Sequence, residues 1–268
     1  MAARSLLRIA TYNVHGCVGR DGRHDPERVA SVISELDVDV AALQEFTYPL
    51  DVALETRTPV VLTSLDDYHC ALGPTRQTTR HCFGNVLLTR HPIQHVHRLN
   101  LSMERREPRG ALAATIAVGD IEIHLLAAHL GLRVSERRFQ VQQLLTYLDD
   151  VRDTPLVVLG DFNDWLPGRS VVHVLDKRLG KPPRPASFPV NLPVLRLDRI
   201  WVSPLPALRG VVRHTSVSAR MASDHLPIVA EIDLDVLRAA RRQRRPEASL
   251  SHEVRLKNAG ADLTKPLR

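Results

Sequence analysis

The chain is built from short apolar runs, and most of them stop at a polar residue. Runs of four to eight residues rich in Val, Ile and Leu recur along its length: Leu6–Tyr12, Val38–Leu43, Asn85–Thr89, Ala111–Val118, Ile121–Ala128, Pro155–Leu159, Arg199–Val202 and Pro227–Ile232. Such lengths and compositions are typical of buried strands. We therefore expect strands to predominate over helices.

Two stretches between these runs have helical signals. Asp25, followed by Pro26 and Glu27, has the pattern of an N-cap with proline at the first helical position, and it predicts a helix through Leu36. A second helix is predicted from Ser135, with apolar residues at helical spacing: Phe139, Val141, Leu144, Leu145 and Leu148.

Connections between the runs indicate how the strands pair. Gly119-Asp120 separates two runs and predicts a two-residue hairpin. We therefore expect a sheet with antiparallel neighbouring strands and covering helices, rather than a purely parallel doubly wound fold. Residues 177–193 are rich in proline and basic residues and predict a surface loop within the domain.

Composition excludes several classes of protein. The 268 residues, 44% of them hydrophobic, suffice for one large α/β domain or two small ones. No run approaches the roughly 20 apolar residues of a membrane span, and Arg4 and Arg8 interrupt the first ten residues. Three cysteines without CxxC spacing argue against a disulfide framework and a zinc site. We expect a cytoplasmic protein.

Polar residues gather where the apolar runs end or begin. Four runs lead into Asn13, Glu45, His129, and Asp161 with Asn163, and two others begin beside Asp198 and Asp224-His225. All six positions fall on one rim if the last two strands run antiparallel to the others. Converging carboxylates, amides and imidazoles on one rim predict an active site.

Taken singly, each of these residues has a structural explanation. A strand-end carboxylate such as Glu45 or Asp198 is most often solvated, His129 fits a core histidine, and Gly160–Asn163 fits a plain turn. Six coincidences of kind and placement favour function instead. Oxygen ligands without cysteine suit Mg²⁺ or Mn²⁺ better than zinc, and the two histidines suit proton transfer and charge stabilisation. Metal-assisted phosphoester hydrolysis is the reaction these groups predict.

The same residues resemble the motifs of the endonuclease/exonuclease/phosphatase superfamily, which includes deoxyribonuclease I and exonuclease III. The resemblance lies in six motifs in the family's order: Thr-Tyr-Asn-Val-His-Gly at 11–16, Leu-Gln-Glu at 43–45, Ala-His-Leu at 128–130, Gly-Asp-Phe-Asn at 160–163, Leu-Asp-Arg-Ile at 197–200 and Ser-Asp-His-Leu-Pro at 223–227. It implies an α/β fold, a four-layer sandwich with two mixed sheets packed face to face.

The resemblance also implies roles. Glu45 would be the main metal ligand, with Asn13 and Asp224 beside it. Asp161, helped by Asn163, would align or deprotonate the attacking water. His225, oriented by Asp198 or Asp161, would act as base or contact the scissile phosphate. His129 would contact that phosphate or protonate the leaving oxygen.

Two departures from the family's motifs, and one segment with two interpretations, bear on the predicted substrate and residue roles. Deoxyribonuclease I orients the histidine that His129 matches with a glutamate, and residues 75–85 contain none. The inositol-phosphatase signature is only half present around Asp198, which disfavours that substrate class. The segment 105–110 precedes a strand, and it fits either a phosphate-binding arginine or a solvated basic turn.

The prediction is a Mg²⁺-dependent phosphodiesterase acting on DNA, within a catalytic domain of residues 1–233. The alternatives are hydrolysis of a lipid headgroup or small metabolite and, from another class, a non-catalytic anion-binding module. Residues 234–268 form a predicted basic helix and tail, whose nine basic and four acidic residues carry +5 of the chain's net charge of +6. This tail could tether the protein to an anionic polymer or membrane surface, or could simply be solvated.

Overall fold

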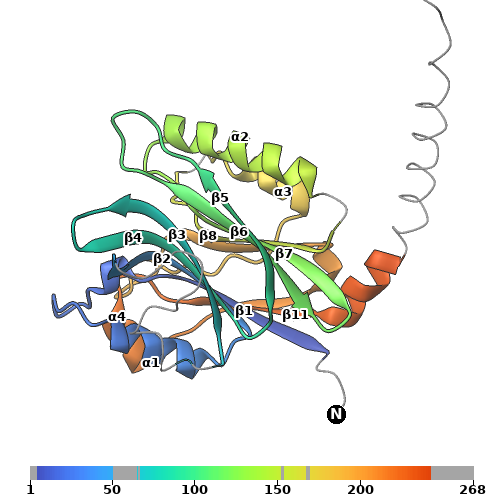
Figure 1. Cartoon of the computed structure of the whole chain (residues 1–268), viewed down its shortest axis with the longest axis horizontal. Helices are drawn as coiled ribbons and strands as arrows, with labels where there is room; N and C mark the ends of the chain where they lie inside the picture. Colours follow the sequence, from blue (N-terminus) through green and yellow to red (C-terminus); the bar gives the residue numbers. More distant parts are fainter. Residues whose placement is uncertain (1–4, 51–64, 66, 152–153, 167–169, 243–268) are drawn as a thin grey trace, which may run out of the picture.

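The computed structural model describes residues 5–50, 65, 67–151, 154–166 and 170–242, and it shows four layers (Figure 1). Six strands form the first sheet: β1 (Leu6–Asn13), β2 (Val40–Pro49), β3 (His69–Gln77), β4 (His81–Thr89), β10 (Leu208–Arg213) and β11 (Ile228–Asp233). Five form the second: β5 (Ile93–Asn100), β6 (Gly110–Val118), β7 (Ile121–His129), β8 (Leu156–Asp161) and β9 (Asp198–Ser203). Both sheets are mixed, since β1 pairs parallel with β2 and β7 with β8 while the other pairs are antiparallel. The predicted four-layer α/β sandwich is confirmed.

Helices cover the outer face of each sheet. The helices α1 (Pro26–Leu36) and α4 (Val217–Ala222) lie below the first sheet in Figure 1, and α2 (Val134–Asp150) and α3 (His173–Leu179) lie above the second. Each outer core combines one sheet face with its helices, as Val32 of α1 and Leu144 of α2 illustrate. The central core contains no α1–α4 side chains and joins the sheets directly, through residues such as Ile9 and Leu159.

Local signals place the predicted helices accurately. The Asp25 carboxylate accepts a hydrogen bond of 2.9 Å from the backbone N–H of Arg28, which caps α1 as predicted. The second helix begins at Val134, one residue before the predicted start. Phe139, which we expected to face the core, is instead 41% exposed, because the buried side of α2 is formed by Val141, Leu144 and Leu148.

The predicted hairpin is confirmed, while two other expectations need correction. Val118 pairs with Ile121 across Gly119-Asp120, and Gly119 has the positive φ of 61° that this turn requires. The predicted loop at 177–193 is irregular from Gly180 onward, as expected, but α3 continues through Leu179, and Ser187 and Val190 are buried rather than at the surface.

The start of the predicted tail belongs to the central core. Residues 234–242 are helical, and Leu234 and Leu237 are buried against strands of both sheets. Arg238 is held by Asp120 at 2.8 Å and by Asp235 at 2.9 Å. The boundary at residue 233 stays a prediction, but an appendage that starts there does not fit this packing. Residues 243–268 of the tail lie outside the described residues.

Within the described part of the chain, no helix combines the length and apolar character that a membrane span requires. The three cysteines, Cys17, Cys70 and Cys82, are all free thiols.

The packing of Leu237 makes a prediction about stability. We expect Leu237→Ala to lower the free energy of unfolding by about 2–5 kcal/mol, because it removes a fully buried side chain from the central core. Val217→Ala, at a side chain that is 81% exposed, should change it by no more than about 0.5 kcal/mol. Urea unfolding followed by circular dichroism measures both, and equal effects would show that residues 234–242 do not pack as described.

Candidate active site

Strand register brings three site residues side by side in the second sheet. Asp161, the last residue of β8, pairs with His129 of β7 on one side and with Asp198 of β9 on the other. This register depends on Gly160: a Cβ atom there would lie 1.9 Å from the backbone oxygen of Ala128. Glycine therefore lets β8 approach β7 closely enough to align the three side chains.

The first sheet brings its site residues to the same rim. Asn13 ends β1, and β11, which follows Asp224 and His225, runs antiparallel to β1. The Asn13 side-chain N–H donates to Asp161 Oδ2 at 2.9 Å, which joins the rims of the two sheets. The predicted convergence of all six positions is therefore observed, whereas the chemical role of each residue stays a prediction.

A β-bulge aims Glu45 into the site. The pairing of β2 with β4 shifts register between Leu43 and Phe46, and Glu45 within this bulge has a positive φ of 59°. Bulges redirect side chains, and a left-handed non-glycine residue stores strain of the kind found at functional sites. The result is a contact of 3.1 Å between the Asn13 side-chain N–H and Glu45 Oε1.

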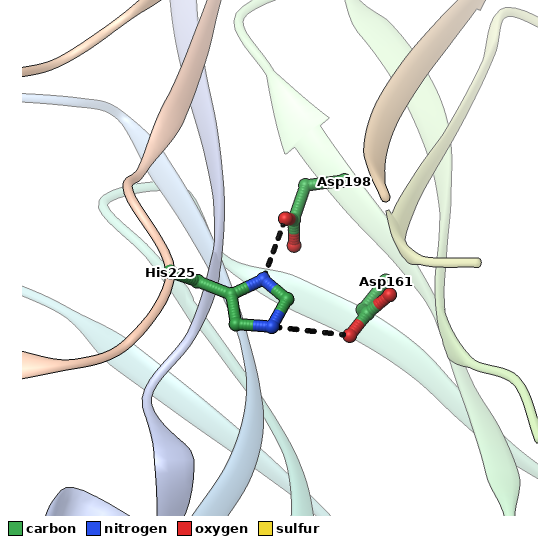
Figure 2. Close-up of side chains that lie close together, drawn as sticks. All are labelled: Asp161, Asp198 and His225. Atoms are coloured by element: carbon green, nitrogen blue, oxygen red, sulfur yellow. Dashed lines mark hydrogen bonds and ion pairs between the residues drawn. The ribbon is translucent and has the colours of Figure 1, made fainter. Parts of the chain in front are cut away.

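His225 lies between two aspartates (Figure 2). Its Nδ1 is 2.8 Å from Asp198 Oδ2, and its Nε2 is 3.8 Å from Asp161 Oδ2. Only the first distance is that of a hydrogen bond, so Asp198 rather than Asp161 orients the ring. The Nε2 atom is left directed into the site, where it can donate to an incoming oxygen atom.

Electrostatics give His225 and Asp161 different proton affinities. Burial disfavours the charged form of His225, but the charge and hydrogen bond of Asp198, together with Asp161, outweigh it and raise the pKa to about 10. Burial and then Asp198 raise the pKa of Asp161 above its usual value, although the positive His225 opposes this. At pH 7 the site therefore holds a protonated imidazole beside a carboxyl group with increased proton affinity.

His129 is held in the opposite protonation state. The Asn163 side-chain N–H group donates to the Leu130 backbone oxygen at 3.0 Å, which fixes the amide, and the same nitrogen lies 3.3 Å from His129 Nε2. His129 Nε2 is thus the acceptor. Burial, then Arg109 and His225, lower the pKa of His129 well below its usual value. In this arrangement His129 can donate a proton only after a bound anion has raised its pKa.

Asp224 lies at the edge of the cluster. Its carboxylate is 4.0 Å from His15 Nδ1, and Ser223, whose hydroxyl also donates to the Asn13 backbone oxygen, lies beside it. The structure thus joins Asn13 and Glu45 directly and places Asp224 near them through the backbone of β1. Whether these three residues bind a metal stays a prediction.

Three further residues contact the site. Arg109, from the segment with two open interpretations, is buried, forms an ion pair of 2.8 Å with Glu107 and lowers the pKa of His129, so a solvated turn does not fit its position, whereas phosphate binding stays a prediction. The Ser187 hydroxyl donates to Asp198 Oδ2 at 2.5 Å. The Phe188 ring lies 4.8 Å from the His225 ring. Residues 187 and 188 carry no sequence signal, because they belong to an irregular, proline-rich segment.

The fold and site together define a hydrolase of phosphoesters, and the comparisons agree. The sequence profile of the Endonuclease/Exonuclease/phosphatase family matches residues 10–225. The chain belongs to this family, whose members hydrolyse phosphoester bonds and generally use a divalent metal.

Relatives and solved structures are consistent with this assignment. The chain is 29% identical over 249 residues to a protein of Escherichia coli strain K12 named "Uncharacterized protein YbhP", covering 85% of this chain and 96% of that one. The fold is similar to that of an endonuclease/exonuclease/phosphatase from Beutenbergia cavernae, with a TM-score of 0.69, 24% identity and coverage of 86% of this chain and 72% of that one. It is also similar to a humanized D. rerio TDP2, with a TM-score of 0.62, 19% identity and coverage of 85% and 98%.

The His225–Asp198 pair predicts a pH dependence of stability. Because the pKa of His225 is raised, the pair contributes stability fully below pH ~6.5, and this contribution declines as the pH rises toward about 10. We expect Asp198→Asn to destabilise the protein more at pH 6 than at pH 9.5, as measured by urea unfolding. In a His225→Gln/Asp161→Asn background, which lacks both titrating neighbours of Asp198, the effect of Asp198→Asn should not depend on pH over this range. A pH-independent effect in the presence of His225 would contradict the assignment.

Proposed function

We propose that this protein is a Mg²⁺-dependent phosphodiesterase that acts on DNA in the cytoplasm. The observation that carries the proposal is a buried histidine that Asp198 holds at Nδ1 and whose Nε2 is directed toward Asp161, a carboxylate that is joined to Asn13 of the other sheet. The free thiols fit a reducing compartment.

The donor set fits a hard divalent cation. Glu45 Oε1 and Asp161 Oδ2 accept hydrogen bonds from the same Asn13 nitrogen, so carboxylate oxygens from both sheets converge without a thiol ligand. Oxygen ligands of this kind suit Mg²⁺ or Mn²⁺. Glu45 would hold the ion, with Asn13 and Asp224 as further ligands, and the bound ion would neutralise charge on the phosphate. Asp161, Asp198 and His225 also have ligand atoms within 4.8 Å of one another, but the Asp198 bond already occupies His225 Nδ1.

The protein's own groups divide the remaining chemistry. Asp161, with its increased proton affinity, aligns a water and accepts its proton, while the Asn163 backbone N–H steadies the carboxylate through a 2.9 Å bond to Oδ1. His225 donates from Nε2 to a phosphate oxygen and stabilises its growing charge. Arg109 adds a buried positive charge near His129. His129 becomes protonated when the anion binds and then faces the leaving oxygen.

DNA is the proposed substrate because a DNA phosphodiester matches the anion that these residues would hold. A structure of D. rerio TDP2 with a single-strand DNA product, 19% identical at a TM-score of 0.60, provides a fold-level analogy. We also propose that the basic tail adds affinity for an anionic polymer or membrane. Arg238 is hydrogen-bonded to Asp120, and Leu237 is buried in the central core. A truncation that leaves this packing intact therefore removes only residues beyond 242.

A lipid-headgroup phosphodiester is the second candidate, and exposed apolar residues favour it. Leu132, three residues after His129, is 59% exposed, and Leu192 and Val194, just before β9, are 70% and 61% exposed. Apolar side chains at such positions would suit a substrate presented at a lipid surface.

The assigned groups predict large losses of turnover. On bis(p-nitrophenyl) phosphate with Mg²⁺, Asp161→Asn and His225→Ala should each lower kcat by about 10²–10⁴-fold, because each removes proton transfer or charge stabilisation. Chelation should abolish turnover, and Glu45→Gln should raise the Mg²⁺ concentration needed for half-maximal rate. Lys177→Ala, at an exposed position on α3, is the matched control and should match wild type. Wild-type activity in Asp161→Asn would rule out this site.

A substrate panel separates the two candidates. We expect single-stranded or duplex DNA to be hydrolysed with a higher kcat/KM than glycerophosphodiesters or phospholipid vesicles, each assayed with Mg²⁺ and with chelator. Replacing Leu192 by serine should leave the DNA rate unchanged. A preference for vesicles that this variant abolishes would favour the lipid candidate instead.

A further inference from the structure

A second pocket begins where the loop after β8 leaves the catalytic centre. It has a volume of about 580 Å³, and Asp164 and Trp165, which directly follow Asn163, form part of its lining. Successive residues of a strand face opposite sides. Asp198 accordingly contacts His225, whereas Arg199 points to the other side of the sheet, lies 6.0 Å from the Trp201 ring and lines this pocket. The pocket therefore adjoins the catalytic centre but is formed by other side chains.

Positive charge predominates in this pocket. Four cationic side chains line it: Lys181, Arg184, Arg196 and Arg199. Among its described lining residues only Asp164 is acidic, and this carboxylate also lies 3.4 Å from Arg137, outside the lining. Arg184 forms an ion pair with Asp176. The two carboxylates thus leave an excess of cationic groups around a volume open to solvent, which favours an anionic ligand.

Arg199 is only partly compensated, because its Nη2 lies 3.8 Å from Asp164 Oδ2, beyond hydrogen-bond distance, and Asp164 is shared with Arg137. Its side chain is 5% exposed, and it donates from Nη2 to the Asp164 backbone oxygen at 2.6 Å and from Nε to the Arg196 backbone oxygen at 3.2 Å. Its Nη1 is buried and has no hydrogen-bond partner among the described residues. A buried N–H group without an acceptor is costly, and more so on a charged group. Burial, then Arg184, lower the pKa of Arg199 to about 10, as expected for an under-compensated cation.

We propose that this pocket binds a second phosphate group of the substrate, separate from the phosphate that is cleaved. Arginine presents several N–H donors in a plane and lysine a compact charge, a combination suited to phosphate oxygens. Trp165, 37% exposed and 5.4 Å from the Arg137 guanidinium, provides an aromatic face for the part of the substrate that joins the two phosphates. The inference rests on the proposed function and adds where a phosphate other than the scissile one is bound, which implies that a substrate with a single phosphate leaves this pocket unused.

Pyrophosphate tests the pocket directly. In the full chain without divalent metal, pyrophosphate should change the fluorescence of Trp165, which lines the pocket, and Trp165→Phe should remove the signal because the remaining Trp201 is fully buried. Lys181 and Arg196 are both exposed, and we expect the double variant Lys181→Glu/Arg196→Glu to weaken pyrophosphate binding by about tenfold or more. Calorimetry measures this affinity. Lys177→Glu/Arg178→Glu, exposed residues of α3 outside the pocket lining, makes the same charge change and should weaken it far less.

The outcomes separate the pocket from the proposed activity. Equal weakening in both double variants, unchanged affinity in Lys181→Glu/Arg196→Glu, or no binding by the wild type would overturn the second phosphate site. Bis(p-nitrophenyl) phosphate has one phosphate, so its kcat/KM should be the same in this variant and in wild type, and a parallel loss would also contradict the inference. Selective pyrophosphate binding by a protein without phosphodiesterase activity would support the pocket and refute the proposed function. Matching circular dichroism and unfolding midpoints establish that the variants are folded.

Discussion

Face-to-face packing of the two sheets is the constraint on which the rest of the structure depends. The central core joins them with aliphatic side chains, to which the helical residues Leu234 and Leu237 add at one end, so the sheets cannot slide without opening a cavity. Their rims then meet where β1 and β8 end, and the Asn13–Asp161 hydrogen bond of 2.9 Å joins them. The site is therefore a consequence of core packing: neither sheet alone holds the complete set of polar residues.

Within the rim, differences in environment give similar groups different chemistry. Both histidines are buried, yet Asp198 holds one in the charged form, and burial together with Arg109 holds the other neutral. Two carboxylates also differ, because Asp198 accepts hydrogen bonds from His225 and Ser187, whereas Asp161 accepts them from Asn13 and the Asn163 backbone N–H. Arg199, outside this cluster, is a buried cation whose Nη1 has no hydrogen-bond partner among the described residues. Unequal proton affinities in one cluster are the arrangement that acid–base chemistry requires.

The sequence predicted the inner strands of both sheets and missed three of the four edge strands; the fourth, β9, was predicted because it is almost entirely buried. All eight predicted runs correspond to strands, whereas β3, β5 and β10 were not predicted, and each is an edge strand. The missed strands lack a long apolar run. β5 is largely polar and exposed, and Pro74 interrupts β3. Strand-end residues such as Asp161 and Asp198 were found because strand direction alone places them on the rim. Ser187 lies in an irregular segment, which no periodic pattern encodes, and Arg199 meets its pocket neighbours Lys181, Arg184 and Arg196 only because such segments fold beside it.

The central claim is that the rim joining the two sheets binds a divalent cation through Glu45. Electron paramagnetic resonance of Mn²⁺ tests it without relying on any substrate, because binding to the protein removes the signal of the free aqueous ion. The account predicts that the wild-type chain and Asp120→Asn, an exposed carboxylate remote from the rim, both deplete this signal, and that Glu45→Gln does so far less. Equal depletion by Glu45→Gln and wild type, or no depletion by wild type, would contradict the account.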